Sequence, residues 1–126
     1  MKNILLIDDD EVSNYLTGMI FKSLEKPPDY LVVKNGEEAI FYLNNRKKLN
    51  LLIILDIHMP VLDGFEFLEQ LKDITIKNSH LVEVILCSAS FSPRDYDKAK
   101  EYEILDFISK PITKEKLLPH FKEVKI

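Results

Sequence analysis

The sequence contains a single cysteine, Cys87, which excludes a disulfide bond within the chain. Because Cys87 lies inside an apolar run, we interpret it as a small buried hydrophobic residue. No apolar run is long enough to cross a bilayer as a helix. Residues 1–4 lead directly into an expected strand and leave no room for a signal peptide. We therefore expect a cytoplasmic protein with no membrane partner.

Positive charge is also less abundant than negative charge. The sequence has 17 Lys and Arg residues and 21 Asp and Glu residues, so the net charge is −4. Domains that bind nucleic acid usually carry a basic surface, and the sequence has no basic stripe, so we expect no nucleic-acid partner. Repeats, linkers and low-complexity segments are absent from the sequence. A chain of 126 residues is long enough for one buried core, so we expect one domain over residues 1–126.

Five short apolar runs alternate with helical patterns along the chain. The strands expected from these runs cover residues 4–7, 30–33, 51–55, 82–87 and 104–109. The helices that follow them are expected to begin near Val12, Glu37, Gly64, Pro93 and Thr113. Strands and helices that alternate with short connections predict parallel strands joined by right-handed crossovers. The expected fold is α/β, a doubly wound five-stranded parallel sheet with helices on both faces.

Several of these elements carry more specific expectations. The first helix is predicted from an apolar stripe of the kind that usually faces a core, made of Val12, Tyr15, Leu16, Met19, Ile20 and Leu24. Residues 75–80 are expected to form a polar connection. The helix after Pro93 has few apolar residues, so it is a candidate for movement. Pro119 is expected to kink or shorten the last helix.

Polar residues with useful chemistry follow four of the expected strands. They are Asp8, Asp9 and Asp10 after the first strand, Asp56 after the third, Ser88 after the fourth and Lys110 after the fifth. In an open parallel sheet, the carboxyl ends of the strands lie along one edge, where ligands bind. We therefore expect carboxylates, a hydroxyl and an ammonium group to share one crevice.

Carboxylates held a few ångströms apart repel each other, and protonation or a bound cation relieves the repulsion. Oxygen ligands favour a hard cation, and Mg²⁺ is usual where a few carboxylates share it with a phosphoryl group. A carboxylate beside a metal ion and an ammonium group can act as a nucleophile toward phosphorus. Each feature alone has a plainer explanation, such as a helix cap for the acidic triplet or a turn for Ser88. Their occurrence together at the ends of these strands favours a site.

These motifs resemble those of the receiver domain of two-component response regulators over the whole chain. The matching residues are Asp8-Asp9, Asp56 with Met59-Pro60 and Asp63-Gly64, Ser88-Ala89 and Lys110-Pro111. The resemblance implies a flavodoxin-like sheet with strand order 2-1-3-4-5. In that order the first and third strands are neighbours, so Asp56 would lie beside the acidic cluster.

The resemblance also implies a role for single residues. Asp56 resembles the aspartate that accepts the phosphoryl group, and Asp8 and Asp9 resemble the pair that binds metal. Asp56 and the main-chain carbonyl of His58 would complete the protein ligands of Mg²⁺. The side chain of His58 could also modulate the access of water, although the use of its backbone alone is favoured.

Further residues resemble the parts of a switch. Ser88 resembles the hydroxyl that moves toward the phosphoryl group, and Lys110 resembles the lysine that pairs with it. Phe107 resembles the aromatic residue that turns inward when the hydroxyl moves. A cis peptide bond before Pro111 is implied as well. Asp10 is expected only to cap the first helix.

The function implied by the resemblance is signalling by phosphorylation, in a single-domain, stand-alone receiver. The partner that donates the phosphoryl group would be a sensor histidine kinase or a phosphotransfer protein. Phosphorylation would change the face formed by the fourth helix, fifth strand and fifth helix and thereby control an unidentified protein target. Apart from promoting its own phosphorylation and dephosphorylation, such a domain is not an enzyme. The kinase, the target and the oligomeric state, a homodimer included, stay open.

Two alternatives also stay open. Residues 7–12 resemble the Asp-x-Asp start of haloacid-dehalogenase-type phosphatases, in which Asp8 would be the nucleophile. Against this hydrolase, only Glu115 and Glu123 are acidic after Lys110, and the chain is short for a substrate cap. The second alternative is a receiver-like binding module that is never phosphorylated. Mapping the phosphorylated residue separates the three functions.

Overall fold

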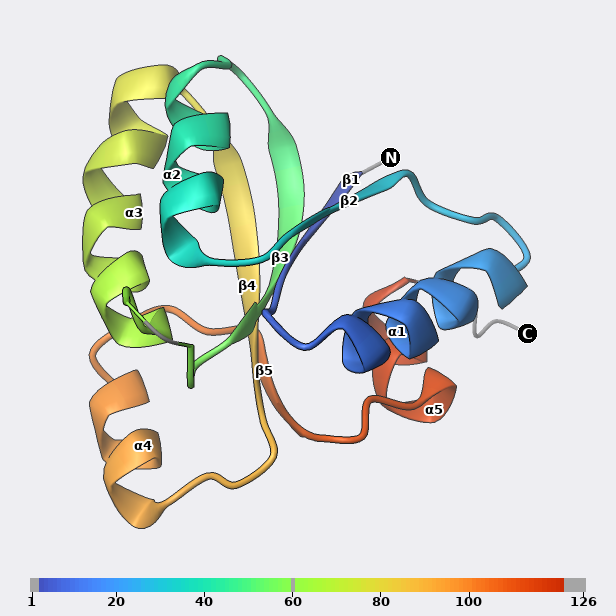
Figure 1. Ribbon diagram of the computed structural model, residues 1–126. Coiled ribbons are helices and arrows are strands. Elements are labelled where there is room, and N and C mark those ends of the chain that lie inside the picture. Colours follow the sequence, from blue (N-terminus) through green and yellow to red (C-terminus); the bar gives the residue numbers. More distant parts are fainter. Residues whose placement is uncertain (1–2, 60, 122–126) are drawn as a thin grey trace.

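Residues 3–59 and 61–121 are described by the computed structural model of the chain (Figure 1). One parallel sheet has the strand order β2-β1-β3-β4-β5. Its strands are β1 (Asn3–Ile7), β2 (Tyr30–Val33), β3 (Asn50–Asp56), β4 (Leu81–Ser88) and β5 (Asp106–Ser109). The helices are α1 (Glu11–Ser23), α2 (Gly36–Asn44), α3 (Gly64–Asn78), α4 (Pro93–Ala99), α5 (Lys114–Leu117) and the short 3-10 helix η1 (Leu118–His120). The predicted fold class and strand order are confirmed.

The sheet separates two layers of helices, with α2, α3 and α4 on one side and α1 and α5 on the other (Figure 1). In β3, Leu51, Ile53 and Leu55 belong to the hydrophobic cluster on the α2 and α3 side, whereas Leu52 and Ile54 belong to the cluster on the α1 and α5 side. All five side chains are at most 3% exposed. A strand covered on both faces therefore explains the unbroken apolar run that precedes Asp56.

Strand register brings the expected site residues to one edge of the sheet. Ile7 of β1 pairs with Leu55 of β3, so Asp8 and Asp56 follow neighbouring positions. Asp56 in turn pairs with Cys87 of β4. Cys87 is buried, and burial raises the pKa of its thiol, which fits its interpretation as a small hydrophobic residue.

Helix α1 forms as predicted, but most of its apolar stripe does not face the sheet. The exposed residues of the stripe are Val12, Tyr15, Leu16 and Met19. The buried residues of the helix are Asn14, Thr17, Gly18 and Phe21. A Cβ atom on Gly18 would stand 2.5 Å from the Oη atom of Tyr30, so α1 packs closely against the side chain of this β2 residue. The helix therefore packs through mostly small and polar side chains.

The polar connection expected at residues 75–80 is wrong, because α3 continues to Asn78. Polar side chains bond to the helix itself: the Thr75 hydroxyl donates to the Lys72 carbonyl at 3.0 Å, and the Asn78 amide donates to the Ile74 carbonyl at 3.0 Å. The helix is capped by Ser79, whose φ of 58° is in the left-handed region.

The last strand is also shorter than expected. The β5 ladder begins at Asp106, although the amide of Leu105 already donates to the Val84 carbonyl at 2.8 Å. The α-helix α5 ends at Leu117, and the next turn, which contains Pro119, is a 3-10 helix. The expected shortening of the last helix by Pro119 is confirmed. Within residues 3–59 and 61–121, no helix combines the length and hydropathy needed for a membrane span.

Candidate phosphoacceptor site

Asp56 ends β3 at the carboxyl edge of the sheet and is 7% exposed. Its Oδ1 atom accepts a hydrogen bond from the amide of His58 at 2.9 Å. Its Oδ2 atom accepts a hydrogen bond from Nζ of Lys110 at 3.2 Å. One hydrogen bond to each oxygen therefore fixes the orientation of this carboxylate.

Asp8 is more deeply buried, at 2% exposed, and it binds Lys110 more closely. Its Oδ2 atom lies 2.6 Å from Nζ of Lys110, and its Oδ1 atom accepts the amide of Asp10 at 3.0 Å. The side-chain amide of Asn14 donates to the main-chain carbonyl of Asp8 at 2.9 Å and holds the backbone in place. Sequence reasoning missed Asn14, whose only signal was a polar residue inside an amphipathic helix.

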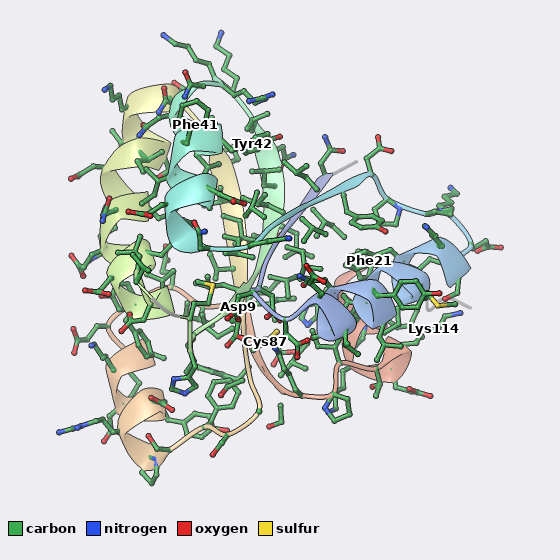
Figure 2. All side chains as sticks on the ribbon, in the orientation of Figure 1. Asp9, Phe21, Phe41, Tyr42, Cys87 and Lys114 are labelled. Carbon is green, nitrogen blue, oxygen red and sulfur yellow. The ribbon has the colours of Figure 1, made fainter. Side chains whose placement is uncertain are left out.

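The three acidic residues expected to bind metal meet at one point. Carboxylate oxygens of Asp8, Asp9 and Asp56 all lie within 4.8 Å of one another. Figure 2 shows Asp9 at the end of the sheet where β1 leads into α1. Asp10 instead caps α1, because its Oδ1 atom accepts the amides of Val12 and Ser13. The prediction that Asp10 is a cap is confirmed.

This donor set fits Mg²⁺, which prefers hard oxygen ligands and commonly binds through few carboxylates. Asp9 is exposed and Asp56 faces a pocket, so a cation from solvent can reach both. The use of the His58 carbonyl as a ligand stays a prediction. The amide of the same residue already anchors the loop to Asp56.

The site favours the charged form of Lys110 and disfavours the charged form of Asp56. Burial raises the pKa of the Asp56 carboxyl above its ordinary value of 3.8, and the Asp8 charge adds to this effect, while the His58 amide and Lys110 partly offset it. Burial alone would lower the pKa of Lys110, but its hydrogen bond to Asp8 and the charges of both carboxylates outweigh burial and raise it. The ammonium group therefore stays charged at neutral pH, beside a carboxylate that resists ionisation.

Replacing Asp56 by Asn is expected to stabilise the folded chain at neutral pH by on the order of 1 kcal/mol, the usual size of one substitution. The native carboxyl holds its proton more tightly than the unfolded one, so its ionisation costs stability as pH rises above 3.8. The gain should disappear near about pH 3, where Asp56 is protonated in both states. Urea unfolding across this pH range measures the difference, and a gain independent of pH would contradict this account.

The pocket beside Asp56 is formed by four parts of the chain, which follow β1, β3, β4 and β5. Its lining residues are Asp9, Asp10, Asp56, His58, Ala89, Ser90, Ser92, Asp95 and Lys110. The segment after β4 and the first turn of α4 thus reach the site. Sequence reasoning did not place Ser92 or Asp95 there, although Ser92-Pro93-Arg94-Asp95 has the spacing of a helix capping box.

Ser88 and Phe107 precede residues that line this pocket, but their side chains make contacts elsewhere, away from Asp8, Asp9 and Asp56. Ser88 is fully buried, and its hydroxyl exchanges two hydrogen bonds of 2.9 Å with the backbone of Ser90. The ring of Phe107 packs against those of Phe91 and Tyr96, with centroids 5.9 and 5.3 Å away. Their switching roles stay predictions. The Lys110-Pro111 peptide bond is cis, as the resemblance implied.

Comparison with known proteins agrees with this geometry. The family model of the response regulator receiver domain matches residues 4–122. The crystal structure of a two-component response regulator from Cytophaga hutchinsonii has a TM-score of 0.81 and 30% identity, covering 96% of this chain and 94% of that one. The receiver domain of Ssk1 from Saccharomyces cerevisiae, solved together with the histidine phosphotransfer protein Ypd1, has a TM-score of 0.76 and 27% identity, covering 92% and 83%.

Curated relatives are often much longer than this chain. The cyclic-nucleotide phosphodiesterase regA of Dictyostelium discoideum is 27% identical over 114 residues, which cover 90% of this chain and 14% of that protein. The chain spans less than half the length of regA and of two other curated relatives, at 14%, 47% and 6%. The family model, in contrast, covers most of the chain. The chain therefore belongs to the response regulator receiver domains, the phosphate-accepting domains of two-component signalling.

Proposed function

We propose that Asp56 accepts a phosphoryl group from a histidine kinase or a phosphotransfer protein in a reaction that depends on Mg²⁺. One observation carries the choice of Asp56. Its carboxylate both lines the pocket and contacts Lys110, whereas Asp8 contacts Lys110 but is absent from the pocket lining. A donor that enters the pocket would therefore meet Asp56 rather than Asp8.

In the transfer, a carboxylate oxygen of Asp56 forms a bond to phosphorus. The phosphorus–nitrogen bond of a phosphohistidine breaks, and its electron pair stays on the ring of the donor. Lys110, already 3.2 Å from Asp56, would neutralise the negative charge of the transferring oxygens. Held by Asp8, Asp9, Asp56 and the His58 carbonyl, Mg²⁺ would supply further positive charge when bound.

The same proposal covers the response to phosphorylation. The new charge and acceptor oxygens would draw the Ser88 hydroxyl away from Ser90, and Phe107 would turn toward the space released. Ala99 is the buried residue of α4, so little apolar burial opposes a shift of the α4, β5 and α5 face. Such a shift would control the protein target, and later hydrolysis promoted by the domain itself would reverse it.

Two other functions are weaker. The hydrolase would need Asp8 as its nucleophile, but Asp8 is 2% exposed and lies outside the pocket lining. It also belongs to a different family from the one that the chain matches. A binding module that is never phosphorylated would not require Lys110 to lie within 3.2 Å of both Asp8 and Asp56.

Incubation with acetyl phosphate and Mg²⁺ tests the proposal. The intact mass of the chain should rise by one phosphoryl group, and peptide mapping should place it on Asp56. Removal of Mg²⁺ with EDTA should reduce the uptake by at least about tenfold, because the repulsion among the carboxylates is then unrelieved. Labelling of Asp8 would favour the hydrolase, and no labelling would favour the binding module.

A further inference from the structure

A contact crosses the rim of the pocket between two separate parts of the chain. The Nε2 atom of His58 lies 3.4 Å from the Oδ2 atom of Asp95. His58 belongs to the loop after β3, two residues past the acceptor, and Asp95 belongs to the first turn of α4. Both residues line the pocket that contains Asp56.

Asp95 is held firmly in its own helix. Its Oδ2 atom accepts the amide of Ser92 at 2.9 Å, and its own amide donates to the Ser92 hydroxyl at 3.1 Å. These two bonds form a capping box at the start of α4. The Asp95 side chain is only 13% exposed, whereas the His58 side chain is 58% exposed. Asp95 is therefore the fixed partner, and the imidazole is the group that it positions.

The backbone of His58 is fixed as well, by the hydrogen bond from its amide to Asp56. With both ends held, the imidazole is confined to the side of the pocket that faces α4. Without Asp95, a ring that is more than half exposed would be free to rotate toward solvent. The Asp95 contact therefore decides whether the imidazole stays at the rim.

We propose that Asp95 is a positioning residue that holds the His58 imidazole at the rim of the pocket and so slows hydrolysis of the phosphoryl group on Asp56. This inference rests on the proposed phosphorylation of Asp56. In hydrolysis, a water oxygen bonds to phosphorus, and the phosphorus–oxygen bond to Asp56 breaks. The electron pair returns to the carboxylate, inorganic phosphate leaves, and the proton of the water passes to solvent. A ring held at the rim reduces the room for that water.

The contact also links the site to α4. The Tyr96 ring, next to Asp95, lies 5.3 Å from the Phe107 ring, centroid to centroid. A partner that displaces α4 would carry Asp95 with it and release His58. The lifetime of the phosphoryl group would then depend on the position of α4, and a partner bound to α4 could change it.

The simpler explanation is that Asp95 only caps α4 and that its contact with an exposed histidine has no effect, as holds for many surface ion pairs. Asp95→Asn separates the two explanations. The asparagine keeps an oxygen that can accept the Ser92 amide, but it removes the charge that attracts His58. Asp97→Asn is a matched control on the same helix, because Asp97 is 77% exposed and its recorded ion pair, at 3.6 Å, is with Lys100.

The experiment compares the intact chain with Asp95→Asn, His58→Ala, the double variant and Asp97→Asn. Each protein is phosphorylated with acetyl phosphate and Mg²⁺, the donor is removed by rapid desalting, and the phosphorylated fraction is followed by intact mass. We expect Asp95→Asn and His58→Ala each to shorten the lifetime by about three- to tenfold. The double variant should match His58→Ala, because Asp95 acts through the ring. Asp97→Asn should keep the wild-type lifetime.

A wild-type lifetime in Asp95→Asn, or additive effects in the double variant, would overturn the positioning role and leave phosphorylation of Asp56 intact. A wild-type chain that takes up no phosphoryl group would overturn both. NMR of the unphosphorylated proteins provides an independent measurement. The His58 ring signals should shift in Asp95→Asn and stay in place in Asp97→Asn, and unchanged signals in both variants would overturn the contact.

Discussion

Asp56→Asn is expected to abolish phosphoryl uptake from acetyl phosphate and from a phosphorylated protein donor. An amide oxygen carries no full negative charge, so the substitution removes the nucleophile while it nearly preserves the size of the side chain. The Asn oxygen can still accept the His58 amide that Asp56 accepts at 2.9 Å. Intact mass is measured over time with Mg²⁺ present. The mass of the wild type should rise by one phosphoryl group, and the mass of the variant should stay unchanged.

Asp9→Asn is the matched comparison within the same cluster. Asp9 is exposed and lacks the contact with Lys110, so its loss should weaken Mg²⁺ binding and slow the uptake without removing the acceptor. More Mg²⁺ should then restore part of the rate of Asp9→Asn and none of that of Asp56→Asn. If Asp56→Asn is labelled as fast as the wild type, the acceptor is another residue, and Asp8 is the first to map.

The position of the site could be predicted because the sequence of the central strand indicates that the strand is buried. Residues 51–55 are apolar at every position, and an unbroken apolar run is typical of a strand whose two faces are both covered. The acidic residue that follows then has to lie at the edge of the sheet. The resemblance to a known family added the strand order, and with it the closeness of Asp8, Asp9 and Asp56.

Contacts between distant parts of the chain could not be predicted in the same way. The 3.6-residue period of α1 predicts a helix, but it does not say which side approaches the sheet. In the structure the side with Gly18 lies against Tyr30, and Leu16 and Met19 are exposed. The contact between His58 and Asp95 likewise depends on how α4 is placed, for which no local pattern exists.

Gly64→Ala is expected to destabilise the chain by about 2 kcal/mol, within the usual cost of overpacking, and to slow phosphoryl uptake. A Cβ atom on Gly64 would stand 2.6 Å from Cα of Ile57 and 3.1 Å from the carbonyl oxygen of Asp56. Both are backbone atoms of the strand end that holds the acceptor, so the site has to move. A shift of the acceptor by a fraction of an ångström should lower the uptake rate by roughly tenfold. Urea unfolding and uptake from acetyl phosphate measure the two effects.

Gly18→Ala shows why the identity of the obstructing atom decides the outcome. Its Cβ would stand 2.5 Å from the Oη atom of Tyr30, closer than any contact of Gly64, yet that atom is the end of a side chain that can shift. Alanine also favours the interior of a helix over glycine by about 1 kcal/mol, which offsets the cost of the shift. We therefore expect nearly unchanged stability and normal uptake in Gly18→Ala. If Gly64→Ala were tolerated equally well, the loop after Asp56 would be free to relax, and the acceptor would not be held by its backbone.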